Sequence, residues 1–239
     1  FSSETDTASI TVTSVNDEPD LTVPNRTVNE DAGAQTVGGF ATTSSGAAQL
    51  EGSQTFSYSL SNNNNALFSA QPAIAPNGTL TFTPATDAFG SATVTVNVTD
   101  SGGTANGGDN SATRTFALTV NSVNDEPGLT VPNRTVDEDA GAQTVVGFAT
   151  PSNGATQLEG SQTFSYALSN NNNALFSAQP AIAPNGTLTF TPATDAFGSA
   201  TVTVNVTDSG GTANGGDNSA TRTFALTVNS VNDEPIATF

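Results

Sequence analysis

The sequence repeats with a period of 108 residues, and no other feature constrains its fold as strongly. The tetrapeptide Asn-Asp-Glu-Pro occurs at residues 16–19, 124–127 and 232–235, and successive copies are 108 residues apart. Solenoid repeats of about 20 to 45 residues need neighbouring repeats to bury their apolar side chains, whereas a domain of about 100 residues buries its own core. The period therefore predicts complete domains joined head to tail.

The two copies of the repeat are almost the same sequence. Residues 16–123 and 124–231 differ at seven positions, which are Asp20/Gly128, Asn29/Asp137, Gly38/Val146, Thr43/Pro151, Ser45/Asn153, Ala48/Thr156 and Ser59/Ala167. The stretch Leu60–Val123 recurs unchanged as Leu168–Val231. Two domains with separate specialised roles would have diverged, so we expect both copies to do the same job.

The period also sets the expected domain boundaries. Residues 8–15 align with Phe116–Val123, the end of the first repeat, so residues 1–18 are assigned to the last strand and linker of a preceding repeat. Residues 19–126 form the first repeat and residues 127–235 the second. Residues 236–239 begin a further repeat or a tail.

Each repeat has the pattern of an all-β domain. Short runs of β-branched and aromatic residues alternate with polar residues and are separated by turn residues such as Asn77-Gly78. In the first repeat the pattern predicts strands at residues 21–28, 35–41, 54–60, 67–74, 79–83, 92–98 and 113–121. Seven strands of this kind predict an immunoglobulin-like β-sandwich, present twice in tandem. The expected core residues are Phe40, Phe56, Tyr58, Leu60, Leu67, Phe68, Leu80, Phe82, Val94, Val96, Val98, Phe116, Leu118 and Val120.

The charge balance excludes several kinds of function. Twenty-two acidic residues face four basic ones, all arginine, and the net charge is −18. A nucleic-acid partner needs a basic surface, and membrane insertion needs a long apolar run or a basic amphipathic segment, so neither is expected. The chain has no Cys, His or Lys, which leaves a carboxylate pair as the remaining catalytic option, and no pattern indicates a cleft around one. We therefore expect a secreted protein that is not an enzyme.

The acidic residues gather at strand ends and in loops, where they favour a hard divalent cation. If the last strand of a repeat runs towards the exit linker, Glu30 and Asp87 lie at the exit end and Asp100 and Glu51 at the opposite end. Carboxylate, amide and carbonyl oxygens are the ligands of Ca²⁺, and the absence of His and Cys argues against Zn²⁺ and copper. The candidate ligands are Glu30, Asp87, Asp100, their copies Glu138, Asp195 and Asp208, Glu159, and the linker residues Asn16, Asp17, Glu18, Asn124, Asp125, Glu126, Asn232, Asp233 and Glu234.

The linker and three further segments resemble cadherins. Ser122-Val-Asn-Asp-Glu-Pro127 is similar to the cadherin linker Asp-x-Asn-Asp-Asn-x-Pro, and Val28-Asn-Glu30 to a Val-x-Glu segment whose glutamate binds calcium in that family. Val96-Asn-Val-Thr-Asp100 resembles the cadherin Val-x-Ala-x-Asp motif, and Asp87 stands where cadherins carry Asp-Arg-Glu. The cadherin Asp-x-Asp pair is missing, so the resemblance implies one or two Ca²⁺ ions at a junction.

The whole repeat looks like the cadherin-like extender repeats of giant bacterial RTX-type adhesins. This resemblance implies a bacterial cell-surface protein in which Ca²⁺ between repeats stiffens the array, with neighbouring repeats as the first partners and glycans or proteins bound through other domains. The alternative is a module that itself binds carbohydrate or protein through its loops, including the asparagine run 62–65. A solvated turn explains that run as well.

Overall fold

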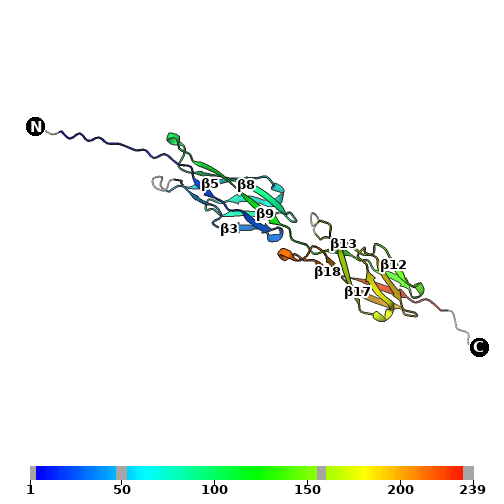
Figure 1. Ribbon diagram of the computed structural model, residues 1–239. Coiled ribbons are helices and arrows are strands. Elements are labelled where there is room, and N and C mark those ends of the chain that lie inside the picture. Colours follow the sequence, from blue (N-terminus) through cyan, green and yellow to red (C-terminus); the bar gives the residue numbers. More distant parts are fainter. Residues whose placement is uncertain (1–3, 47–52, 155–159, 234–239) are drawn as a thin grey trace, which may run out of the picture. The chain divides into compact units, whose positions relative to one another are not determined.

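The computed structural model describes residues 4–46, 53–154 and 160–233. The chain divides into two compact units, Phe1–Ser122 and Val123–Phe239, called module 1 and module 2 below. The described residues form strands and short 3-10 helices, which confirms the all-β class (Figure 1). The linker residues 124–126, which the repeat pattern assigned to the end of the first repeat, lie in the second unit.

The described residues of module 1 form nine strands in three sheets. The strands are β1 (Asp20–Thr22), β2 (Arg26–Asn29), β3 (Gln35–Val37), β4 (Thr42–Ser44), β5 (Phe56–Asn62), β6 (Phe68–Ile74), β7 (Leu80–Pro84), β8 (Gly90–Asp100) and β9 (Ser111–Asn121). The sheets have the orders β2-β9-β8-β5, β3-β7-β6 and β1-β4. The 3-10 turns η1 (Glu30–Ala32), η2 (Asn65–Leu67) and η3 (Ala105–Gly107) join some of them.

Module 2 has the same topology. Its strands are β10 (Gly128–Thr130), β11 (Arg134–Asp137), β12 (Gln143–Val145), β13 (Thr150–Ser152), β14 (Phe164–Asn170), β15 (Phe176–Ile182), β16 (Leu188–Pro192), β17 (Gly198–Asp208) and β18 (Ser219–Asn229), with turns η4 (Glu138–Ala140), η5 (Asn173–Leu175) and η6 (Ala213–Gly215). The sheet orders are β11-β18-β17-β14, β12-β16-β15 and β10-β13.

The core of each module forms between its sheets, and the long strand β8 shows why. Ala92, Val94, Val96 and Val98 alternate with polar residues and are at most 1% exposed, since successive side chains of a strand point to opposite faces. Burying one such valine fully contributes about 1.5 to 3 kcal/mol. All the expected core residues lie in the core or pack against it, together with Leu21, Val28, Ala41, Ile74, Ala92 and Ala112.

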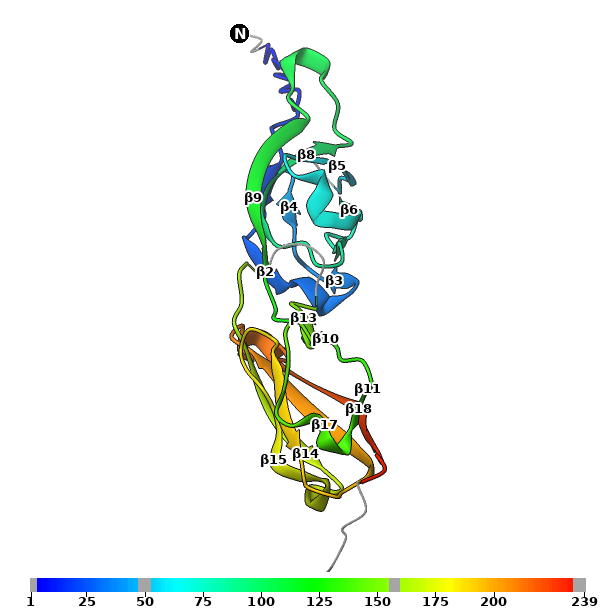
Figure 2. The same ribbon diagram turned by 90° about the vertical axis from the view of Figure 1, so that its right-hand side faces the viewer.

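The antiparallel pair β8-β9 defines the two ends of a module, and the long strand β9 is visible in Figure 2. Thr99 pairs with Ser111 at one end, here called the head, and Gly90 pairs with Val120 at the other, called the foot. The backbone of Asp109, at the head, bonds to that of Asn16. The chain therefore enters a module at its head and leaves β9 at its foot.

The strand predicted at residues 21–28 is two strands with different partners. β1 pairs with β4, and β2 pairs in parallel with β9, because Pro24 between them has no N–H to continue a ladder. The side chain of Asn25 compensates at the switch, accepting a hydrogen bond of 2.8 Å from the N–H of Ala117 in β9.

The strand predicted at residues 35–41 is also divided. β3 ends at Val37, and Gly39, with a φ of +64°, turns the chain before β4 begins at Thr42. The predicted turn at residues 76–78 is present between β6 and β7, where the N–H of Gly78 donates to the carbonyl of Ala75 over 2.8 Å.

Residues 4–19 form no strand, and Ile10 and Val12 in this segment are 91% and 86% exposed. A strand needs a neighbouring strand to accept its backbone hydrogen bonds, and no described strand of either module pairs with this segment. Its assignment to the last strand of a preceding repeat stays a prediction.

One of the seven sequence differences removes a hydrogen bond from module 2. The hydroxyls of Thr43 and Tyr58 lie 2.7 Å apart in module 1, whereas Pro151 replaces the threonine in module 2. The hydroxyl of Tyr166 is consequently buried without a hydrogen-bond partner. Burial also raises the pKa of Tyr166 above its ordinary value of 10.0, because the phenolate would lose its hydration.

Replacing Pro151 by threonine should stabilise module 2 by about 1 kcal/mol, since the buried Tyr166 hydroxyl regains a partner. Calorimetry of the whole chain would measure the change as a higher melting temperature of one module. Pro151→Val is the matched control, because it removes the proline without adding a hydroxyl. Equal stability of the two variants would contradict the hydrogen-bond explanation.

Candidate functional site

Carboxylates extend the inward-facing row of core residues at both ends of each module. At the head, Asp100 follows Val98 by two residues and therefore points to the same face of β8. At the foot, Glu30 comes two residues after Val28 of β2 and is the buried first residue of the 3-10 turn η1. Both acids are almost buried, with 6% and 5% of their surface exposed, as are their copies Asp208 and Glu138, each at 6%. A buried carboxylate is costly unless donors or a cation surround it, so these four positions need partners.

At the head of module 2 the partner is the linker asparagine. The Asn124 Nδ2 donates to Asp208 Oδ1 over 3.1 Å and to the carbonyl of Asp217 over 2.7 Å. The Gln162 Nε2 donates to Asn124 Oδ1 over 2.9 Å, and the N–H of Asp217 donates to the Asn124 carbonyl over 2.8 Å. Asp208 Oδ1 also accepts the N–H of Gly210 over 2.9 Å. The linker is thus fixed to the head by its asparagine.

The head of module 1 repeats this arrangement. The Asn16 Nδ2 donates to Asp100 Oδ1 over 3.0 Å and to the carbonyl of Asp109 over 2.7 Å. The Gln54 Nε2 donates to Asn16 Oδ1 over 2.8 Å, and the N–H of Gly102 donates to Asp100 Oδ1 over 2.9 Å. Asn16 therefore has the same partners as Asn124.

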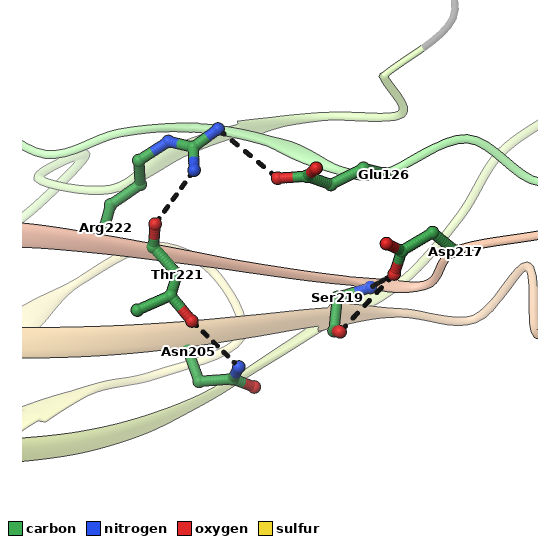
Figure 3. A network of polar contacts seen from close by, with 6 residues as sticks. All are labelled: Glu126, Asn205, Asp217, Ser219, Thr221 and Arg222. Atoms are coloured by element: carbon green, nitrogen blue, oxygen red, sulfur yellow. Dashed lines mark hydrogen bonds and ion pairs between the residues drawn. The ribbon is translucent and has the colours of Figure 1, made fainter.

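The linker glutamates pair with arginines of the last strand. Glu126 lies 3.6 Å from Arg222 of β18 (Figure 3), and Glu18 lies 3.8 Å from Arg114 of β9. Their side chains are about half exposed, so each pair contributes less than about 1 kcal/mol. Figure 3 also shows the Asp217 Oδ1, which accepts the N–H of Ser219 over 3.0 Å and so holds the loop before β18.

At the foot of module 2 the buried carboxylate bonds to the exit segment. Glu138 Oε1 accepts the N–H of Val231 over 2.8 Å. The foot loop before β17 carries Asp195, whose φ of +57°, like the +55° of Asp87 in module 1, is uncommon outside glycine. Asn232 and Asp233 of the exit linker are exposed.

Among the described residues, three buried carboxylate oxygens have no hydrogen-bond partner, and a cation would supply the partner that each lacks. They are Asp100 Oδ2 and Asp208 Oδ2 at the heads and Glu138 Oε2 at the foot of module 2. Ca²⁺ needs about six to eight oxygens, however, and the described residues contain no group of three acidic side chains that could hold a metal together. Glu51, Glu159 and Glu234 lie outside the described residues, so any contribution from them stays a prediction.

The sequence reasoning missed the neutral partners at the head, which are Gln54 and Gln162 together with the carbonyls of Asp109 and Asp217. Nothing in the local sequence marks Gln162, since it lies 38 residues from Asn124. The sequence does contain one indication of the site, which is the glycine pair Gly102 and Gly108, repeated as Gly210 and Gly216. These glycines leave room for the linker asparagine. A Cβ atom at Gly210 would overlap Asn124 Oδ1, and one at Gly216 would lie 2.9 Å from the Asn124 backbone.

The asparagine-rich loop is a structural element in both modules. The Asn171 Oδ1 accepts the N–H of Thr201 over 2.8 Å, and Asn170 Oδ1 accepts the N–H of Asn172 over 2.9 Å. The Asn170 Nδ2 donates to Gln179 over 2.9 Å. Side chains engaged in this way hold the loop to β15 and β17, and this favours a structural role for it over sugar binding.

Solved structures share this architecture. The two-domain structure of human protocadherin-24 EC1-2, form II, is 15% identical, with a TM-score of 0.57 over 89% of this chain and 99% of that one. Drosophila N-cadherin EC1-4 is 16% identical, with a TM-score of 0.55 over 90% of this chain and half of that one. The fold is cadherin-like. No family model and no curated protein sequence matches the chain.

The cadherin-like modules agree with the resemblance seen in the linker and in three further segments, and at these low identities the agreement concerns the fold. Among the described residues, no helix has the length and apolar character needed to cross a membrane.

Proposed function

We propose that the two modules are extender repeats of a bacterial cell-surface adhesin, which hold a binding domain away from the cell. Their near-identity supports this, because a spacer gains length from each copy and needs no specialisation. The fold supports it as well, since the solved structures of similar architecture are likewise chains of successive domains.

The observation that carries the proposal is the repeated attachment of the linker. In both modules the linker asparagine makes the same three side-chain hydrogen bonds, to an aspartate, a carbonyl and a glutamine. In an array of such units, the linker that enters each module is hydrogen-bonded to the head of that module. Fewer linker residues are then free to act as a flexible hinge. This is the property that a spacer requires.

Ca²⁺ at the junctions is the second part of the proposal. The ligands would come from the foot acids Glu30 and Asp87 with linker residue Asp125, and from their copies Glu138, Asp195 and Asp233 at the next junction. The buried Glu138 Oε2, which has no hydrogen-bond partner, supports this assignment. A bound ion would supply positive charge that offsets the repulsion between these carboxylates and so limits bending.

Saturating Ca²⁺ should stabilise the chain by about 1 to 3 kcal/mol if the dissociation constant lies near the millimolar range typical of extracellular modules. Calcium titration calorimetry and melting curves with and without chelator measure this. The double variant Glu30→Gln/Glu138→Gln should lose the response. Asp20→Asn is the control, since Asp20 is exposed and module 2 has Gly128 in its place. No Ca²⁺ response, or an undiminished one in the double variant, would refute these ligands.

A further inference from the structure

We propose that the head of each module is a site built for the linker asparagine, which fastens the entering chain by direct hydrogen bonds and is not itself a cation ligand. This inference concerns each module alone. It goes beyond the proposed function, because it holds whether or not Ca²⁺ binds between repeats. The sequence reading placed Asn16 and Asn124 among the cation ligands, and the geometry of the head gives them a different role.

The head is complementary to the side-chain amide and the backbone carbonyl of Asn124. Its Nδ2 has two hydrogens, and Asp208 Oδ1 and the Asp217 carbonyl accept one each. Its Oδ1 accepts from Gln162, and its backbone carbonyl accepts from the N–H of Asp217. An aspartate at this position would place an oxygen against two acceptors, and an alanine would leave them without a donor. The donor and acceptor pattern therefore selects asparagine.

Two glycines leave the space that the asparagine fills. A Cβ atom on Gly210 would overlap the Asn124 Oδ1, and one on Gly216 would lie 2.9 Å from the Asn124 backbone nitrogen and oxygen. Neither glycine has a positive φ, so their conformation alone does not require glycine. Module 1 has the same relation between Gly102, Gly108 and Asn16. Close approach of the linker is thus the physical reason for these glycines.

Hydrogen-bond donors at the head occupy the positions that a cation would need beside Asn124 Oδ1 and Asp208 Oδ1. The Gln162 Nε2 directs its hydrogen at Asn124 Oδ1, and Asn124 Nδ2 and the Gly210 N–H direct theirs at Asp208 Oδ1. A cation bound to either oxygen would face the positive ends of these N–H dipoles. These amide donors satisfy Asp208 Oδ1, whereas Asp208 Oδ2 has no hydrogen-bond partner.

The test introduces the substitution in both modules, since the two heads have the same contacts. Asn16→Ala/Asn124→Ala should lower the melting temperature by about 5 to 15 °C, as each head loses three side-chain hydrogen bonds. Asn16→Asp/Asn124→Asp should be similarly destabilised in chelator and should recover part of the loss in Ca²⁺, because it creates a cluster of facing oxygens. In the unsubstituted chain the linker asparagines should stay hydrogen-bonded to the heads both in chelator and in Ca²⁺.

Amide hydrogen exchange measures directly whether the hydrogen bonds between the head and the linker asparagine are formed. The N–H groups of Asp109 and Asp217 donate to the linker asparagines, so the identical segments 102–111 and 210–219 should exchange slowly in chelator and equally slowly in Ca²⁺. Both double variants should speed exchange there in chelator. Fast exchange in the unsubstituted chain on chelation, or alanine variants with unchanged stability and exchange, would overturn the inference. If the maximum dimension of the chain is the same with and without Ca²⁺, the proposal of Ca²⁺ ions between repeats is refuted. The inference about the head does not depend on that outcome.

Discussion

Replacing Phe224 by alanine is expected to destabilise module 2 by about 3 to 5 kcal/mol and to leave module 1 unchanged. Phe224 is 2% exposed in β18, and its ring packs edge-on against Phe148 with the centroids 4.8 Å apart. Removing it leaves a cavity between the sheets in addition to the lost apolar burial. The cores of the two modules share no residue, so the loss should stay in one module.

Calorimetry of the whole chain should then resolve two transitions, one at the original temperature and one well below it. Phe116→Ala is the matched variant, because Phe116 packs against Phe40 in module 1 at the same 4.8 Å. It should produce the same pair of transitions. A single transition that moves as a whole would show that the modules unfold together, and the interpretation as independent spacers would fail.

Replacing Asp208 by alanine should cost module 2 about 2 to 4 kcal/mol, because two N–H donors at the head lose their acceptor. Asp208 Oδ1 accepts from Gly210 and from Asn124 through two part-buried hydrogen bonds, and a donor shielded from water that loses its acceptor costs about 1 to 3 kcal/mol. Denaturant unfolding of the whole chain measures the loss. Asp100→Ala should have the same effect on module 1.

Asp208→Asn separates the hydrogen bonds from the charge. An asparagine oriented with its oxygen at the Oδ1 position keeps both bonds, so this variant should retain most of the stability. If it is as unstable as the alanine variant, the negative charge of Asp208 matters more than its two hydrogen bonds, and a cation at the head becomes the better explanation.

The sequence predicted the sandwich and the positions of its buried acids more successfully than it predicted their partners. Alternation along β8 identifies Val94, Val96 and Val98 as core, and the same alternation places Asp100 on the inward face at the head. At the foot, Glu30 has the same spacing of two residues from Val28, although it begins the 3-10 turn η1 after β2. These features depend on local periodicity, which is readable in a single sequence.

The remaining features depend on contacts between distant residues. The switch of strand partner at Pro24 requires Asn25 to meet Ala117, which lies 92 residues away. The role of Asn124 requires Gln162 and Asp217 to converge on it. An acid-rich linker favours a cation site because its carboxylates are obvious in the sequence. An asparagine or glutamine whose amide makes a hydrogen bond at the head is not marked by any sequence pattern of its own.

Small-angle X-ray scattering of this chain, with Ca²⁺ and with chelator, tests the proposed function most directly. If the modules are extenders stiffened by ions at their junctions, Ca²⁺ should increase the maximum dimension and narrow the distribution of interatomic distances, and Glu30→Gln should abolish the difference. A maximum dimension that is the same in Ca²⁺ and in chelator would contradict the stiffening role of calcium.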